Sequence, residues 1–171
     1  MHKLRDAPGD LEEGLSKQLE AIARGRMVYV LGLGNTDRAD DGAGVIVAER
    51  LKKDFPSFSF SEHDGVEGTV LDISEKGGDA VVFFVDAANL NLAPGEIRVV
   101  RRERINDREI TTHRVAVALM AAVLDKAGMD SAVICIQPRA TEFRGAVSEP
   151  VTQAIRTVES ALKSLLAKRN A

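Results

Sequence analysis

Short apolar runs rich in β-branched residues recur along the chain at intervals that suit strands. The strongest, residues 80–85 (AVVFFV), contains no polar side chain and is followed by Asp86. Such runs are typical of strands covered on both faces, as in a parallel sheet. In residues 96–104, Ile97 and Val99 alternate with charged side chains, as on an edge strand. The pattern predicts strands at residues 27–33, 58–63, 80–85, 96–104 and 131–136.

Amphipathic segments separate these strands. Residues 11–24 repeat an apolar side chain every three or four positions, after Asp10, which can cap the first turn. Thr112 can cap a later helix in the same way, and Pro150 can open the last one. The first helix would bury Leu11, Leu15, Leu19 and Ile22. The pattern predicts helices at residues 11–24, 43–54, 69–76 and 113–126, and from residue 150 to about residue 165.

Strands that alternate with helices indicate an α/β fold. The length of 171 residues suits a single domain. We therefore expect one three-layer domain, with a mostly parallel twisted sheet of about five strands and helices on both faces. The N-terminal helix is an addition to this alternation, which divides the chain into a tail and helix (1–26) and an α/β domain (27–171). This helix is expected to pack on the sheet, and docking to a partner is the alternative.

Composition narrows the function classes. A formal net charge of -3 gives no basic footprint for nucleic acid. The one cysteine, Cys135, lies in an apolar run and is expected to be a buried core thiol, which is compatible with a reducing cytoplasm. No run reaches the length of about 18 apolar residues that a membrane span needs, and residues 1–14 lack the apolar stretch of a secretory signal. We therefore expect a cytoplasmic protein that does not insert into membranes.

Three possible metal ligands, Asp41, Asp86 and His113, follow predicted strands or open a predicted helix. In open α/β sheets, ligands bind beyond the carboxyl ends of the strands, so these side chains are expected to converge. Two carboxylates and an imidazole suit a divalent metal with open positions, which can activate water and polarise an amide. The positive end of the helix is expected to keep the His113 ring neutral, as a metal ligand must be. The set predicts metal-linked hydrolysis of a peptide bond.

Each of these residues also has a purely structural alternative. Asp40 and Asp41 can cap the helix that begins near Gly42, Asp86 can simply end its strand, and His113 can be a surface residue. If the chemical interpretation holds, Asp40 is a catalytic neighbour that could steer the attacking water, and loop support is its alternative role.

Further candidates lie in the loops beside this set. Asn35, in the loop after the first strand, and Asp64 and Gly65, after the second, are possible cleft residues. A structural turn is the alternative for Asp64 and for its neighbour His63.

The first loop also invites comparison with a dinucleotide-binding loop, because residues 32–34 read GLG. Asp37 stands where the third glycine would be, and Asp40 and Asp41 put negative charge where a pyrophosphate would sit. The loop therefore favours a cation. The chain has no G-x-S-x-G or H-E-x-x-H motif, which removes support for serine hydrolases and zincins.

Five segments together resemble the maturation endopeptidases of [NiFe] hydrogenases, over roughly residues 27 to 165. The resemblance implies an endopeptidase that removes a C-terminal extension from the hydrogenase large-subunit precursor once nickel has been inserted. The segments are residues 32–44 (GLGNTDRADDGAG), 64–72 (DGVEGTVLD), 81–97 (VVFFVDAANLNLAPGEI), 111–123 (TTHRVAVALMAAV) and 136–151 (IQPRATEFRGAVSEPV).

The resemblance also implies particular ligands and partners. The family's metal-contacting positions fall on Asp41, Asp86 and His113, and some members carry Glu in place of Asp41. The divalent metal would be nickel supplied by the precursor, with zinc or another ion as the alternative. The precursor is the expected partner, and we expect a monomer. Two other functions stay open: a nickel-recognising carrier that cuts nothing, and a nucleotide-binding regulator.

Overall fold

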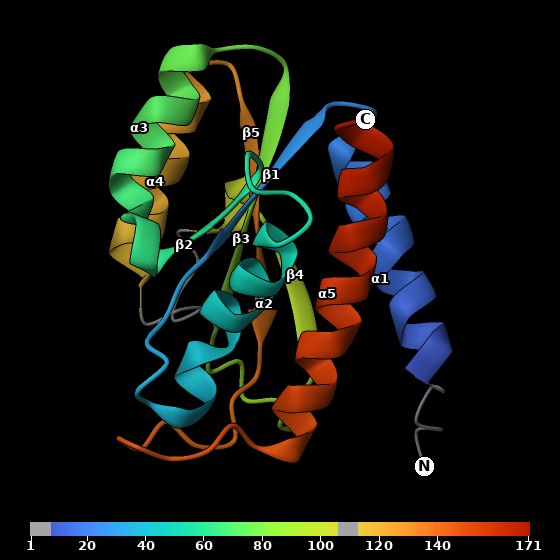
Figure 1. Ribbon diagram of the computed structural model, residues 1–171, viewed down its shortest axis with the longest axis vertical. Coiled ribbons are helices and arrows are strands. Elements are labelled where there is room, and N and C mark those ends of the chain that lie inside the picture. Colours follow the sequence, from blue (N-terminus) through green and yellow to red (C-terminus); the bar gives the residue numbers. More distant parts are fainter. Residues whose placement is uncertain (1–7, 106–112) are drawn as a thin grey trace.

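The computed structural model describes residues 8–105 and 113–171 of the chain. Five strands form one sheet, and helices cover both of its faces (Figure 1). This is the α/β architecture that the sequence predicts. The described α-helices are α1 (Pro8–Ala23), α2 (Ala43–Lys52), α3 (Val66–Lys76), α4 (Arg114–Lys126) and α5 (Glu149–Arg169), and the short 3-10 helices are η1 (Ala39–Gly42), η2 (Glu62–Asp64) and η3 (Arg102–Arg104).

The sheet has the strand order β2-β1-β3-β5-β4. All neighbours are parallel except β4, which runs antiparallel to β5. Strand β4 lies at the edge of the sheet, as its charged, alternating sequence predicts. From β1 the chain moves to β2 on one side, and from β3 it moves toward β5 on the other, so the order reverses between β1 and β3. Ligands bind at such a switch point in doubly wound sheets. The strands are β1 (Met27–Gly32), β2 (Ser59–Ser61), β3 (Ala80–Ala87), β4 (Ile97–Arg101) and β5 (Asp130–Ile136).

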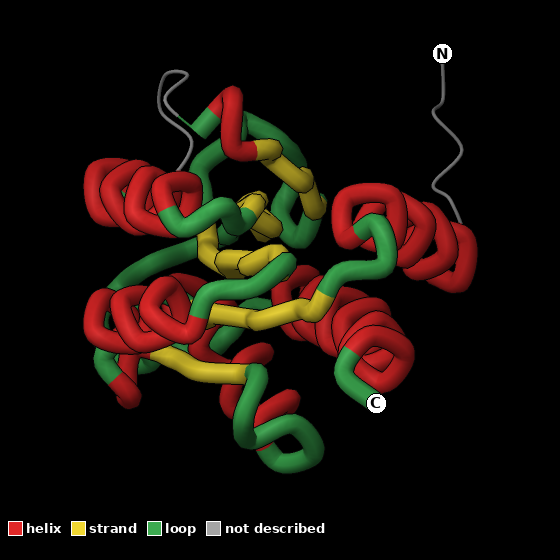
Figure 2. The backbone as a smooth tube through the Cα atoms, turned by 90° about the horizontal axis from the view of Figure 1, so that it is seen from above, coloured by secondary structure: helices red, strands yellow, loops and turns green. Residues whose placement is uncertain are grey.

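Two hydrophobic cores lie on opposite faces of the sheet. One contains α1, α2 and α5, and the other contains α3 and α4. Seen from above, the strands lie between these two groups of helices (Figure 2). Along β3 the side chains alternate between the cores, so that Phe83 enters the first and Phe84 the second. Within the described residues, no helix combines the length and the hydropathy that crossing a membrane requires.

The N-terminal helix packs against α5 rather than lying directly on the sheet. Leu15, Leu19 and Ile22 enter the first core as predicted, but Leu11 is 53% exposed and does not belong to the buried face. Because α1 shares this core with the strands, nothing in the packing separates it from the rest, and the boundary at residue 26 stays a prediction.

Three predicted boundaries shift in ways that concern the site. Residues 62–64 form η2 instead of extending the second strand, and α3 begins at Val66, before the predicted start. Strand β3 continues to Ala87, so Asp86 is part of the strand instead of following it. His113 is the N-cap residue of α4. The predicted cap Thr112 lies outside the described residues.

Two glycines let α2 approach the sheet closely. A Cβ on Gly44 would lie 2.0 Å from the carbonyl oxygen of Val85, and one on Gly32 would lie 2.1 Å from that of Gly44. Only a residue without a side chain fits at either position. This contact holds the beginning of α2, and with it η1, beside the carboxyl end of β3.

Candidate active site

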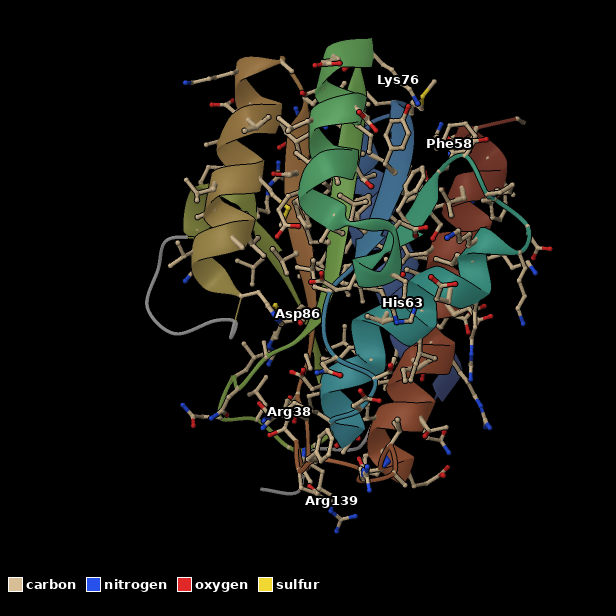
Figure 3. The ribbon with its side chains drawn as sticks, turned by 60° about the vertical axis from the view of Figure 1, so that its left-hand side comes forward. Arg38, Phe58, His63, Lys76, Asp86 and Arg139 are labelled. Atoms are coloured by element: carbon tan, nitrogen blue, oxygen red, sulfur yellow. The ribbon has the colours of Figure 1, made fainter. Side chains whose placement is uncertain are left out.

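Asp86 and His113 meet at the carboxyl end of the central strand. Nδ1 of His113 lies 3.1 Å from Oδ2 of Asp86, which is completely buried. The sequence predicts that these residues converge, and the structure brings them into direct contact. In Figure 3, Asp86 lies near the beginning of α4, the helix that His113 caps.

This contact changes the charge expected for the histidine. The hydrogen bond that the protonated ring donates to Asp86 raises the pKa of His113 to about 8, and the negative charges of Asp86 and Asp41 act in the same direction. The expectation of a neutral ring is therefore wrong, because a buried carboxylate in contact outweighs the partial charge of a helix end. Burial raises the pKa of Asp86, while the bond from His113 opposes that rise. The two residues hold a proton between them at neutral pH.

Asp41 reaches the same region from the loop after β1. It lies in η1, half-buried, and its Oδ2 accepts a hydrogen bond of 3.1 Å from the backbone N–H of Asn35. No side chain caps α2, so the capping alternative for Asp40 and Asp41 fails. The negative charge of Asp41 contributes to the raised pKa of both Asp86 and His113, which places it within electrostatic range of the pair.

The three predicted ligands fit a divalent ion by chemistry but are not gathered as a closed set. Within residues 8–105 and 113–171, no group of three or more His, Cys, Asp or Glu side chains is arranged to hold a metal ion. One observation favours a cation: Oδ1 of Asp86 is buried and has no hydrogen-bond partner in the described part of the chain. Metal binding by Asp41, Asp86 and His113 therefore stays a prediction.

An open cleft of about 500 Å³ lies beside the pair, and the loop after β1, the η2 turn and the beginning of α3 form its walls. Asn35 lines it, as predicted. Two carboxylates in this wall, Glu62 and Glu67, are not among the site residues predicted from the sequence, although Glu67 lies in one of the family-like segments. Their position after β2 was the available signal. The lining residues are Gly34, Asn35, Thr36, Asp37, Glu62, His63, Glu67 and His113.

One carboxylate of the cleft wall, Glu62, has a raised pKa. Partial burial and the neighbouring charge of Glu67 raise the pKa of Glu62, while His113 and the backbone N–H of Gly34 oppose the rise. Glu62 therefore belongs to the same electrostatic cluster as His113 and Asp86. The cleft favours a positively charged ligand, as the loop sequence predicts.

Asp64 and Gly65 are not among the residues that line this cleft, although they lie between His63 and Glu67, which do. Asp64 closes a capping box, in which its Oδ2 accepts from the N–H of Ser61, and its Oδ1 lies 2.5 Å from Nζ of Lys52. Gly65 ends the turn with a φ of +78°, which favours glycine. Both residues shape the η2 turn that presents Glu62 and His63 to the cleft.

Asp40 is an anchor for a distant loop rather than a residue that steers water. It is completely buried and accepts four hydrogen bonds, from the N–H groups of Arg139 (2.8 Å), Ala140 (3.2 Å) and Ser148 (2.7 Å) and from the hydroxyl of Ser148 (2.8 Å). Both oxygens of Asp40 accept hydrogen bonds, so Asp40 attaches residues 139–148 to η1. This attachment holds η1, and therefore the neighbouring Asp41, in place. Figure 3 shows Arg38, next to η1, and Arg139 at the same end of the molecule.

Comparison with known proteins gives this site a context. A family model described as hydrogenase maturation protease matches residues 68–165. This chain belongs to the hydrogenase maturation protease family. It is 28% identical over 152 residues to the hydrogenase expression/formation protein HupM of Azotobacter chroococcum, covering 83% of this chain and 72% of that protein. It is also 28% identical over 138 residues to the hydrogenase 3 maturation protease of Escherichia coli, covering 78% and 87%.

Solved structures of other maturation proteases have the same fold. The [NiFe] hydrogenase maturation protease HycI of Thermococcus kodakarensis matches with a TM-score of 0.74 and 26% identity, over 88% of this chain and 99% of that one. The crystal structure of a hydrogenase 3 maturation protease matches with a TM-score of 0.62 and 26% identity, over 79% and 88%. The chain is thus a peptidase, and the resemblance found in its sequence is confirmed.

Proposed function

We propose that this maturation protease removes the C-terminal extension from the precursor of a [NiFe] hydrogenase large subunit. The observation that carries this proposal is the Asp86–His113 pair, which stands at the sheet's switch point beside an open cleft with a carboxylate-rich wall. The open form of the cleft suits a peptide segment that belongs to a larger protein. Its acidic wall suits a substrate that carries a cation.

The cation we propose is nickel that arrives in the precursor, so it is part of the substrate. An ion that the precursor already holds needs no preformed set of three ligands in the protease: Asp41 and Asp86, with His113 when its ring is neutral, can complete its coordination. The unpaired Oδ1 of Asp86 is the strongest candidate among the donor atoms. A nickel ion in this place would polarise the scissile carbonyl.

The protein's own residues can supply the proton transfer. Hydrolysis breaks the amide C–N bond, adds the hydroxyl group of water to the carbonyl carbon and adds a proton to the leaving amine. His113 is protonated at neutral pH and half-buried at the cleft wall. It can give this proton where Asp41 and Asp86 hold the ion without it, because a histidine that binds metal must be neutral. Asp86 fixes the orientation of the ring and stabilises its charged form.

We also propose that the protease works as a monomer in the cytoplasm. The two edge strands of the sheet support a monomer, because neither is suited to pairing with another chain. Strand β2 has only three residues, and β4 carries the exposed Arg98 and the half-buried Arg101. The single, completely buried Cys135 is consistent with a reducing compartment.

The test uses a purified precursor prepared with and without nickel. Mass spectrometry should show a shortened C-terminus only for the nickel-loaded precursor treated with the wild-type protease. Asp41→Asn and His113→Ala should abolish the cleavage, and Asp72→Asn, which changes an exposed carboxylate on α3, should retain it.

Two results would contradict the proposal separately. A precursor that binds but keeps its full mass would identify a carrier instead of a protease for this substrate. Normal cleavage by both Asp41→Asn and His113→Ala would show that the protein is a protease for this substrate but that these two residues are not required for catalysis.

A further inference from the structure

The solvent-facing side of α4 is apolar, which is unusual for a helix at the surface. Residues 115–124 contain no polar or charged side chain. Val117, Met120, Ala121 and Leu124 enter the second core, while Val115 and Leu119 remain 69% and 65% exposed. We call the exposed side the outer stripe. It consists of the exposed Val115, Leu119 and Ala122, together with Ala118, which is half-buried and also packs against the second core.

The other helices show what the solvent side of a helix in this protein normally carries. On α5 the exposed positions include Gln153, Arg156 and Lys163, opposite its buried apolar side. A helix that is apolar on all sides is typical of an element covered by protein on all sides. Figure 3 shows α4 at the margin of the molecule, with α3 beside it and none of the described helices on its outer side. Among residues 8–105 and 113–171, no helix gives the outer stripe the cover that its sequence suits.

The position of the outer stripe indicates what covers it. Helix α4 begins directly after His113, which lines the cleft and contacts Asp86. With a rise of about 1.5 Å per residue, Ala122 lies about 13 Å along the helix from His113. The helix that carries the stripe therefore begins at the cleft wall. A protein whose C-terminal segment occupies the cleft must lie close to it.

We propose that the outer stripe docks the folded body of the substrate protein while its C-terminal segment occupies the cleft. This inference rests on the proposed function and adds the surface by which the protease recognises its partner. An apolar centre that excludes water is the usual core of such an interface. Because the helix that carries the stripe starts at the cleft wall, the stripe lies near the segment that the cleft would hold. This nearness favours the substrate protein over a second copy of this chain as the occupant.

The experiment compares two leucines with similar exposure on opposite sides of the molecule. Leu119→Glu places a charge in the outer stripe, and Leu11→Glu places the same charge on α1, where Leu11 is 53% exposed. Binding to the immobilised nickel-loaded precursor is measured by biolayer interferometry, and processing by mass spectrometry over a series of precursor concentrations. We expect Leu119→Glu to weaken binding at least tenfold and to raise KM by a similar factor, with kcat unchanged. Leu11→Glu should match the wild type in all three quantities.

Additional measurements give each outcome a meaning. Circular dichroism checks that Leu119→Glu is folded, and Val115→Gln serves as the second variant if it is not. Unchanged binding by the folded stripe variant would overturn the proposal. So would a wild-type dimer that Leu119→Glu converts to a monomer in light scattering, because a second copy would then be the occupant. Weakened binding to a precursor that the wild type does not cut would support the docking surface while removing the proposed function.

Discussion

At the scale of single residues, the Asp86–His113 contact makes stability depend on pH. The pKa of His113 is about 8 in the folded protein, against an ordinary value of 6.5. The stabilisation is therefore complete below about pH 6.5 and disappears as the pH rises through about 8. The shift corresponds to at most about 2 kcal/mol, and to less after solvent screening, because a third of the side chain is exposed. His113→Gln should lower the free energy of unfolding more at about pH 6 than at about pH 9, in urea denaturation with a chelator present.

His63 provides the control for this measurement. Its side chain is 60% exposed and its Nδ1 lies 3.8 Å from Oε1 of Glu49, a longer contact than the one in the pair. His63→Gln should therefore leave the pH dependence of unfolding as it is in the wild type. If His113→Gln cost the same free energy at both pH values, the contact with Asp86 would not carry the charge assigned to it.

Asp40 allows a second prediction at this scale. Asp40→Asn keeps the size of the side chain but replaces one acceptor oxygen by an NH2 group, which is itself a donor, so the donors that faced this oxygen lose their partner. Each unsatisfied buried donor costs about 1–3 kcal/mol, so we expect a loss of at least about 2 kcal/mol in the free energy of unfolding. Asp37→Asn, in the same loop but exposed, should change it by less than about 0.5 kcal/mol. Equal effects of the two substitutions in urea denaturation would show that the four hydrogen bonds are not what anchors the loop.

At the scale of elements, the distance between α2 and the sheet decides where η1 and Asp41 lie. Gly44→Ala would place a methyl group 2.0 Å from the carbonyl oxygen of Val85, so α2 must move away from β3. We expect a loss of more than about 3 kcal/mol, together with reduced processing, since the movement displaces the beginning of α2. Gly68→Ala is the matched control, because a Cβ there has no atom within 4 Å and alanine favours a helix by up to about 1 kcal/mol. Thermal unfolding of both variants distinguishes the two cases, and equal melting temperatures would contradict the close approach.

At the scale of the whole molecule, the fold follows from the sequence more directly than the site does. Apolar runs and amphipathic periods are repeated signals, so a misplaced boundary such as the start of α3 leaves the sheet order unchanged. The site depends on single side chains. The sequence indicated Asp86 and His113 through their positions at element ends, but it could not show that a direct contact charges the histidine. The sequence also could not distinguish the role of Asp40 from that of Asp41. Asp40 is an anchor because it binds residues 139–148, which lie far away in the chain, and Asp41 instead lies near the Asp86–His113 pair.

The N-terminal helix tests whether the molecule unfolds as one unit. Leu19 is completely buried in the first core together with strand residues, and Glu20 joins α1 to the end of α5 through Lys168 and Arg169. Leu19→Ala should therefore lower the free energy of unfolding of the entire protein by about 2–5 kcal/mol, whereas Leu11→Ala should cost less than about 0.5 kcal/mol. Unfolding can be followed by circular dichroism and by the fluorescence of Tyr29 on β1, since the chain has one tyrosine and no tryptophan. A single transition by both probes, displaced only by Leu19→Ala, is expected if α1 is part of the cooperative fold. A separate early transition seen by circular dichroism alone would instead support a boundary at residue 26.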